Sequence, residues 1–219
     1  MLKTTDLLDL SKTIAAELFE NAEYPWQVLG NIKSFILKLG ETLPSDKFEK
    51  LGEDVWIAKS AKVFPSAYIA GPCIIDEDAE VRHCAFIRGS AVVGKNCVVG
   101  NSVELKNVVL FDNVQVPHYN YVGDSVLGYK AHMGAGSITS NVKSDKTLVV
   151  VREGEERQET GLKKFGAVLG DNVEVGCNSV LNPGTVVGRN SNIYPLSSVR
   201  GTVPPGSIYK NADDIVSKN

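Results

Sequence analysis

The chain has 219 residues, of which 43% are hydrophobic and 22% charged, so it is long enough to bury one sizeable core. Its formal net charge is −3 at pH 7 and its Lys and Arg residues form no cluster, which argues against nucleic acid as a partner. No apolar stretch reaches membrane-spanning length, and residues 1–10 lack the apolar run of a signal peptide. We therefore expect a cytoplasmic protein with no membrane partner.

Residues 1–50 predict a short α-helical domain. Apolar residues share one helical face over residues 6–19, and a second apolar face runs through residues 25–39. Pro25 suits a helix start and Gly40 a helix stop. Helices that precede a repeat domain most often cap its first coil, whose open strand edge would otherwise invite aggregation. Docking of a partner is the alternative.

Residues 51–219 predict a repeat domain, because an aliphatic residue returns every six positions from Leu51 to Asn141 and again from Phe165 to Val203. A fixed short period of this kind is the signature of a parallel β-helix. Three hexads make one triangular coil, so residues eighteen apart stack about 4.8 Å above one another. The repeated residues are Leu51, Ile57, Val63, Ile69, Ile75, Val81, Ile87, Val93 and Val99, then Leu169, Val175, Leu181, Val187 and Ile193.

The period is interrupted in two ways. Residues 105–109 and 122–126 are five-residue units, which mark either tolerated corners or an edge reshaped for a ligand. Between residues 142 and 164 the period vanishes, and the sequence around Gly154 predicts a hairpin that projects from the solenoid. This insertion is either a tolerated surface loop or a cover for a site on its own or a neighbouring subunit.

The cysteines and histidines do not predict a metal site. The three histidines, His83, His118 and His132, show no short regular spacing, and no His-rich or Asp-rich hexad surrounds them. We interpret His83 as a solvated surface residue. Three cysteines lie inside hexads, where reduced Cys serves as a compact hydrophobe: Cys73, Cys84 and Cys97.

One cluster of side chains could carry chemistry. His118 lies in the bulky segment VPHYNY, between the two short units. Arg88 and Lys106 are the second residues of units one coil apart, so they stack on one face, and Tyr121 ends the unit that runs into the corner of that face. Two stacked cations suit a phosphate, and an imidazole, with a pKa near 6.5, suits a general base. Spacing alone leaves open whether these residues form a site or are unrelated.

Three segments resemble a known family. NSVELKN, VPHYNYVGDSVLG and GAGSITSN are similar to the acetyltransferase domain of the bifunctional enzyme that makes UDP-N-acetylglucosamine from glucosamine 1-phosphate. TGLKKFGAVLGDNVEVG looks closer to the archaeal sugar-1-phosphate nucleotidylyltransferases that carry a similar domain. The resemblance covers roughly residues 50–205. It implies a mostly β fold, the left-handed parallel β-helix, in a homotrimer with active sites at the subunit interfaces and acetyl-CoA as cosubstrate.

The resemblance also implies roles for the clustered residues. His118 matches the general base that takes a proton from the attacking amine. Arg88 and Lys106 match residues that hold the sugar phosphate, and Tyr121 matches one that contacts sugar and phosphate. Glu104 is either an orienting carboxylate or a surface charge.

Four further positions match those that meet acetyl-CoA in the family: Ala135, Asn141, Cys177 and Pro195. The backbone amide of Ala135 would also stabilise the thioester oxyanion. The chain departs from the bacterial pattern where His132 replaces a sugar-contacting Asn and where Val142 replaces a Tyr. His132 is then a substrate contact, a second titrating group or a solvent-facing corner residue.

The sequence therefore favours an acetyl-CoA-dependent N-acetyltransferase that acts on a phosphorylated amino sugar, whose identity stays open. The changes at His132 and Val142 favour the alternative of a non-catalytic sugar-phosphate binder or scaffold. Another acyl-CoA acyltransferase, such as a serine O-acetyltransferase, ranks last because residues 1–50 are too short for that family's helical domain. They also show no Gly-rich nucleotide-binding loop, so we expect no pyrophosphorylase activity.

Overall fold

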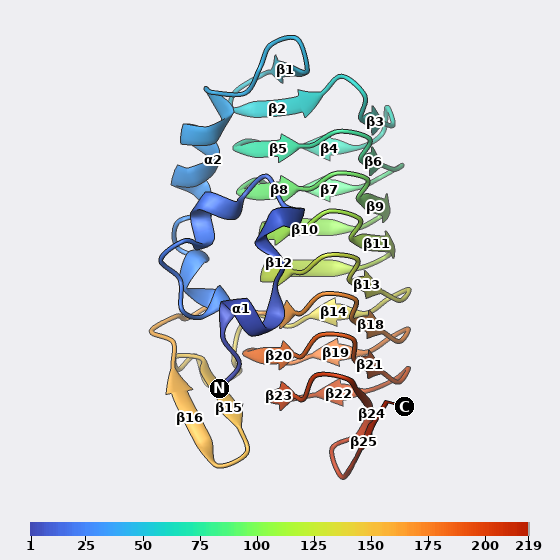
Figure 1. Ribbon diagram of the computed structural model, residues 1–219. Helices are drawn as coiled ribbons and strands as arrows, with labels where there is room; N and C mark the ends of the chain where they lie inside the picture. Colours follow the sequence, from blue (N-terminus) through green and yellow to red (C-terminus); the bar gives the residue numbers. More distant parts are fainter. Residues whose placement is uncertain (219) are drawn as a thin grey trace.

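A computed structural model describes residues 1–218, which form a β-solenoid with an α-helical segment along one flank and a hairpin near one end (Figure 1). The α-helices are α1 (Thr4–Leu7) and α2 (Ile32–Gly40), and 3-10 turns cover Leu10–Lys12, Ala16–Phe19 and Pro25–Val28. None of the helices in residues 1–218 has the length and apolar character needed to cross a bilayer.

The coils are triangular, as the period of six predicts, and their strands pair in parallel along three faces. Face one contains β2 (Val55–Ala58), β5 (Cys73–Ile75), β8 (Ala91–Val93), β17 (Ala167–Leu169), β20 (Thr185–Val187) and β23 (Thr202–Val203). Face two contains β4 (Tyr68–Ile69), β7 (Phe86–Ile87), β14 (Ile138–Thr139), β19 (Val180–Leu181) and β22 (Ser198–Val199). Face three contains β3 (Lys62–Val63), β6 (Glu80–Val81), β9 (Val98–Asn101), β11 (Gln115–His118), β13 (His132–Met133), β18 (Glu174–Val175), β21 (Asn192–Ile193), β24 (Ser207–Asn211) and β25 (Asp214–Ser217).

The two five-residue units have a structural cause. They lie in the long strands β10 (Glu104–Leu110) and β12 (Tyr121–Leu127), each of which runs through the corner from face two to face one. The corner residues, Asn107 and Asp124, keep a positive φ of 54° and 48°. Because both units are shortened, β10 and β12 stay in register with each other, and the two faces join into one sheet.

The core of the solenoid consists of the inward aliphatic residues that the repeat predicts, most of them fully buried. One predicted position, Leu51, is wrong, and it is 44% exposed. Val63 pairs in the predicted register with the buried Val81, and it is 37% exposed because β3 is the outermost strand of face three. Leu51 belongs to β1 (Phe48–Leu51), which pairs antiparallel with β2 instead of starting a coil. At the other end of the solenoid β25 pairs antiparallel with β24, so an antiparallel strand covers an outer edge at each end.

The N-terminal segment differs from its prediction. The helix expected over residues 6–19 is α1 followed by two 3-10 turns, whereas the second expected helix is present as a 3-10 turn from Pro25 and as α2, which ends at Gly40. Residues 1–40 lie along face one, where α2 contacts β5, β8 and β10 (Figure 1). These helical residues do not cap the first coil, whose outer edge is covered by β1. Backbone hydrogen bonds from Asp112 N–H to Lys12 O and from Asp171 N–H to Leu7 O, both 2.9 Å, hold it there.

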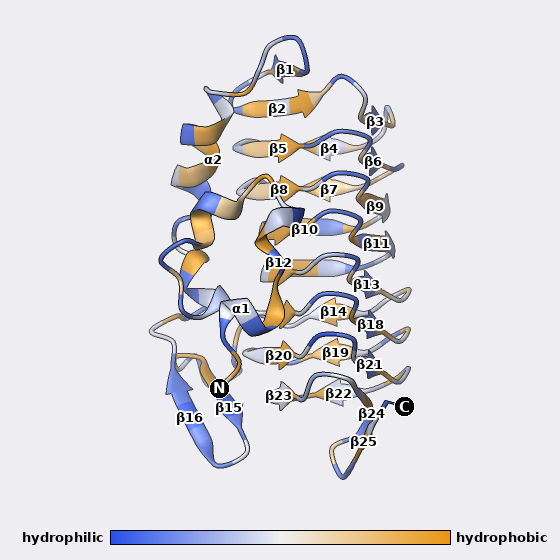
Figure 2. Cartoon of the chain, viewed as in Figure 1, coloured by the Kyte–Doolittle hydropathy of each residue, from blue (hydrophilic) through white to orange (hydrophobic). Residues whose placement is uncertain are grey.

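The insertion forms the expected hairpin, β15 (Val150–Glu153) with β16 (Glu156–Glu159). Figure 2 shows β16 as hydrophilic, whereas β5 and β8 on face one are hydrophobic. The hairpin is anchored at its base, because Val151 is fully buried and β15 packs against β23. Gly184 and Gly201 allow this approach, since a Cβ at either would lie within 3.1 Å of hairpin atoms. The hairpin is therefore a fixed part of the surface.

Candidate functional site

His118 lies at the end of β11, just before the corner from face three to face two. It is exposed, whereas Asn120, two residues on, is 2% exposed and fixes the corner. The Asn120 Oδ1 accepts a hydrogen bond from the N–H of His118 at 3.1 Å, and its Nδ2 donates to the carbonyls of Gly134 and Ser137. The imidazole therefore projects from a backbone that a buried amide holds in place.

Strand register places three of the expected cosubstrate positions in one outward column with His118. The register of β11, β13, β18 and β21 sets Ala135 next to His118, Cys177 next to Ala135, and Pro195 next to Cys177. Each step is one strand spacing of about 4.8 Å. Cys177 and Pro195 also line a shallow groove of about 340 Å³. Asn141 is separate from this column, because it follows β14 at the other end of face two.

The two predicted phosphate cations lie on face two, and each is paired with a carboxylate. Arg88 Nη1 lies 2.7 Å from Glu104 Oε1, so Glu104 orients Arg88. Lys106 Nζ lies 3.2 Å from both carboxylate oxygens of Asp124, which is 4% exposed. Arg88 and Lys106 are adjacent in the column, since Ile87 pairs with Leu105. The expected stack of cations is thus a stack of ion pairs that retains unused N–H donors.

Tyr121 connects the two ends of face two. It follows the corner after His118, pairs in register with Glu104, and its hydroxyl accepts a hydrogen bond from Asn141 Nδ2 at 3.2 Å. The phenol lies over Gly123, where a Cβ would come within 2.5 Å of the hydroxyl oxygen. Burial, followed by the negative charges of Asp124 and Glu104, raises the pKa of Tyr121. The hydroxyl therefore stays protonated at neutral pH and remains a hydrogen-bond donor.

His132 does not point freely into solvent. It starts β13 opposite Gln115, three residues before the position of Ala135, and its Nδ1 lies 2.7 Å from Glu174 Oε2 on the next coil. His132 and Glu174 line the same groove as Cys177. Across residues 1–218, His, Cys, Asp and Glu side chains do not gather in groups of three that could hold a metal ion.

Two residues that the sequence did not single out, Asp124 and Asn120, belong to this region. Asp124 accepts hydrogen bonds from Lys106, Asn107 and Asn141, and so joins both short units to the GAGSITSN segment. Asn120 positions His118 as described above. Lys164 precedes Phe165, whose N–H donates to the carbonyl of Asn141 at 3.0 Å, so the end of the insertion returns beside Asn141. The signal for Asp124 was its place in the second short unit.

The family is established by comparison with known proteins. A family model described as the GMPPB C-terminal domain matches residues 69–193, more than half of the chain, including both short units and His118. The chain belongs to this family. Among relatives of this member of the GMPPB C-terminal domain family, a protein named "Bifunctional protein GlmU" from Methanococcus aeolicus is 33% identical over 212 residues, which cover 89% of this chain and 47% of that protein.

A second relative, from Sulfurisphaera tokodaii, is named a bifunctional sugar-1-phosphate nucleotidylyltransferase/acetyltransferase and is 32% identical over 160 residues. The match covers 65% of this GMPPB C-terminal domain family member and 40% of the relative. The chain spans about half the length of the curated relatives it matches. Among solved structures, a hexapeptide transferase family protein from Anaplasma phagocytophilum is 16% identical with a TM-score of 0.43, covering 75% of this chain and 80% of that one.

Proposed function

We propose that this chain transfers the acetyl group of acetyl-CoA to the amine of a phosphorylated amino sugar, with His118 as the general base. The observation that carries the proposal is the placement of His118 at one corner, with the Arg88, Lys106 and Tyr121 cluster on the adjoining face. The name of the Sulfurisphaera tokodaii relative, which includes acetyltransferase and sugar-1-phosphate nucleotidylyltransferase activities, supports the same substrate class.

The reaction requires a neutral amine that attacks the carbonyl carbon of the acetyl thioester. A C–N bond forms, negative charge develops on the carbonyl oxygen, and collapse of the tetrahedral intermediate breaks the C–S bond. His118 accepts the proton that the amine loses and returns it to the departing thiolate, so the products are the N-acetyl sugar and free CoA. Ala135 suits the oxyanion, because its backbone N–H donates to no other group within residues 1–218.

The phosphate would bind to Arg88 and Lys106 without disturbing their carboxylate partners. Arg88 uses one of its five N–H donors for Glu104. Lys106 is only 27% exposed, so its charge is fixed in position by Asp124 and is only partly screened by water. The protonated hydroxyl of Tyr121 supplies a neutral donor beside them. Together these groups would hold a phosphate through charge-assisted hydrogen bonds.

The placement of Asn141 supports a site shared between subunits. Asn141 lies at one end of face two, whereas Cys177 lies beyond the corner at the other end. A cosubstrate bound between two copies of the chain would meet Cys177 of one copy and Asn141 of the other. We therefore propose that the chain acts as a homotrimer with one active site at each interface.

A thiol-release assay with acetyl-CoA tests the proposal, using glucosamine 1-phosphate, galactosamine 1-phosphate and nucleotide-linked amino sugars as acceptors. We expect turnover with at least one acceptor, and a loss of about 10²–10⁴-fold in kcat for His118→Ala. His83→Ala is the matched control, because His83 is an exposed residue of the same column, one coil from Asn101 and two from His118. No thiol release with any amine, together with no binding of acetyl-CoA, would refute the proposal.

A further inference from the structure

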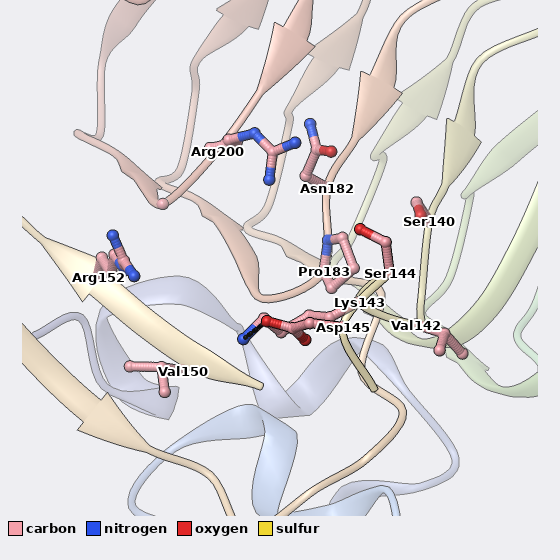
Figure 3. Close-up of a pocket in the computed structure, with 11 residues that line it drawn as sticks. Ser140, Val142, Lys143, Ser144, Asp145, Val150, Arg152, Asn182, Pro183 and Arg200 are labelled. Carbon is pink, nitrogen blue, oxygen red and sulfur yellow. Dashed lines mark ion pairs between the residues drawn. The ribbon is translucent and has the colours of Figure 1, made fainter. Parts of the chain in front are cut away.

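A second cationic hollow lies between the hairpin and the solenoid, away from His118 (Figure 3). Its volume is about 500 Å³, and three cations line it: Lys143 from the loop after β14, Arg152 from β15 and Arg200 from the turn after β22. The hydroxyl-bearing residues Ser140 and Ser144 complete one wall. The hollow therefore collects positive charge in a chain whose net charge is negative.

The charges around this hollow do not balance. Lys143 Nζ lies 3.3 Å from Asp145 Oδ2, and this pair is neutral overall. Hydrogen bonds from the N–H and hydroxyl of Thr147 lower the pKa of Asp145, which keeps its carboxylate ionised. Arg152 and Arg200 make no ion pair with any residue in the range 1–218. Two guanidinium groups thus face one hollow without a counterion.

The hairpin shows how such an imbalance is resolved elsewhere. Two like-charged pairs lie directly opposite across its strands, Glu153 with Glu156 and Arg152 with Arg157. Like charges in this arrangement destabilise a sheet. The acidic pair is bridged by the α-amino group of Met1, at 2.8 Å and 3.2 Å. The arginine pair lies on the opposite face of the same hairpin. Within residues 1–218, no carboxylate forms an ion pair with either of its two arginines.

Arg152 is held in a fixed position, which a binding site requires. Gly201 has a φ of 74°, and a Cβ there would lie 3.1 Å from the carbonyl oxygen of Arg152, so only a glycine lets β15 come this close. Val151, next to Arg152, is fully buried. The guanidinium of Arg152 therefore projects from an anchored strand, not from a free loop.

We propose that Lys143, Arg152 and Arg200 form a binding site for a phosphate-bearing anion, separate from the Arg88 and Lys106 pair. The planar guanidinium fork matches phosphate oxygens in two-point contacts, and two such forks with an ammonium suit a diphosphate. Arg200 lies in the same column as Lys106 but four coil steps away, which is about 19 Å at about 4.8 Å per step. One phosphate cannot occupy both places. This site does not depend on the proposed acyl transfer.

Calorimetric titration of the full chain with pyrophosphate, inorganic phosphate, ADP and CoA tests this site. For Arg152→Gln/Arg200→Gln we expect roughly tenfold or greater loss of pyrophosphate affinity, because two charge-assisted contacts disappear. Lys33→Gln/Lys59→Gln is the control, since it removes the same charge from exposed positions on α2 and the first coil. Binding to the unaltered chain should weaken as ionic strength rises.

The four ligands distinguish the source of the phosphate. An equal loss of affinity for CoA and pyrophosphate would assign the site to the diphosphate of CoA, and a loss for ADP and pyrophosphate alone would assign it to a separate nucleotide. Affinities within twofold of the control for every ligand would overturn the proposal. If the double variant does not fold, hydrogen exchange of residues 148–160 in the unaltered chain decides, because bound pyrophosphate should slow it and no protection overturns the site.

Discussion

Faces one and three are built from hexads of the same pattern but present opposite surfaces. The outward column of face one is apolar and buried: Trp56, Ile74, Val92, Val109, Val126, Val168 and Val186. The outward column of face three is largely polar and open: Lys62, Glu80, Val98, Gln115, His132, Glu174 and Asn192. The inward residues of both faces are aliphatic, so the difference lies only in the residues that point out.

This contrast teaches that two periods operate in the chain. The period of six sets the core, whereas the longer period of one coil sets what each face touches. The outward residues of face one are apolar because residues 1–40 cover them. The ring centroids of Phe19 and Phe111 are 5.5 Å apart, and those of Trp26 and Phe165 are 5.8 Å apart. Faces two and three stay open and carry the proposed acyl-transfer site.

Removing the cover from face one should have the largest effect on stability. Trp26 is 2% exposed, stacks on Tyr24 at 4.7 Å and packs against Phe165. We expect Trp26→Ala to lower the free energy of unfolding by about 3–5 kcal/mol, because a large cavity opens between the segment and face one. Denaturant unfolding measures this loss. Leu196→Ala is the control on the open side, since Leu196 is 79% exposed and should change stability by less than about 0.5 kcal/mol.

The contrast also explains how much of the fold the sequence predicts. The period of six reveals the solenoid because every coil repeats it, and Gly40 marks the end of α2. The predicted position of residues 1–40 was wrong, because their role as a cap was inferred only from their place before the first coil in the chain. The valines and isoleucines at Ile74, Val92 and Val109 carried the signal for a covered face, but it appears only when every third hexad is compared.

Removing the side chain that fixes the corner beside His118 should lower both stability and kcat. We expect Asn120→Ala to destabilise the fold by about 1–3 kcal/mol, because the carbonyls of Gly134 and Ser137 lose their buried donor. It should also lower kcat, since the His118 backbone loses its acceptor. Ser207→Ala is the control, because the buried Ser207 hydroxyl donates to Pro204 O at a corner between faces one and three, away from His118. Equal kcat losses in both variants would assign Asn120 a structural role only.

A subtler change on face two tests the position of Tyr121. A Cβ at residue 123 would come within 2.5 Å of the phenol oxygen, so we expect Gly123→Ala to displace the Tyr121 side chain. KM for the sugar phosphate should rise about tenfold with a smaller change in kcat, because a substrate contact is moved and the base is not. Gly30→Ala is matched, since a Cβ at Gly30 meets nothing within 4 Å. An unchanged KM would remove Tyr121 from the proposed site.

The candidate site could be predicted only in part, because the sequence shows which residues stack but not which side chains reach one another. Spacing stacks Arg88 and Lys106, because register follows the backbone alone. It does not reveal that Glu104 and Asp124 neutralise them, since those contacts depend on how far each side chain extends across a corner. The hollow beside Arg152 was hidden because the hairpin has no period that relates it to Arg200.

The smallest predicted effect concerns a buried carboxyl group at the edge of the covered face. Asp76 is 1% exposed, and its Oδ2 has no hydrogen-bond partner within residues 1–218. Burial raises the pKa of Asp76, opposed by a hydrogen bond from the N–H of Glu77 and by the charge of Lys95, while Asp112 raises it further. Because the folded chain then holds this proton more tightly than the unfolded chain, stability falls as pH rises from the unfolded pKa through the raised one.

Asp76→Asn should remove this dependence of the unfolding free energy on pH, because an amide does not titrate. Relative to the unaltered chain, the variant should be similar near pH 4 and more stable by on the order of 1 kcal/mol at pH 7, where the unaltered carboxylate is buried and charged. Unfolding free energies across this range measure the difference, in which the titrations of other groups cancel. Asp78→Asn, at an exposed position two residues on, should give a flat difference. A flat difference for Asp76→Asn as well would mean that the covered edge admits enough water to solvate the charge.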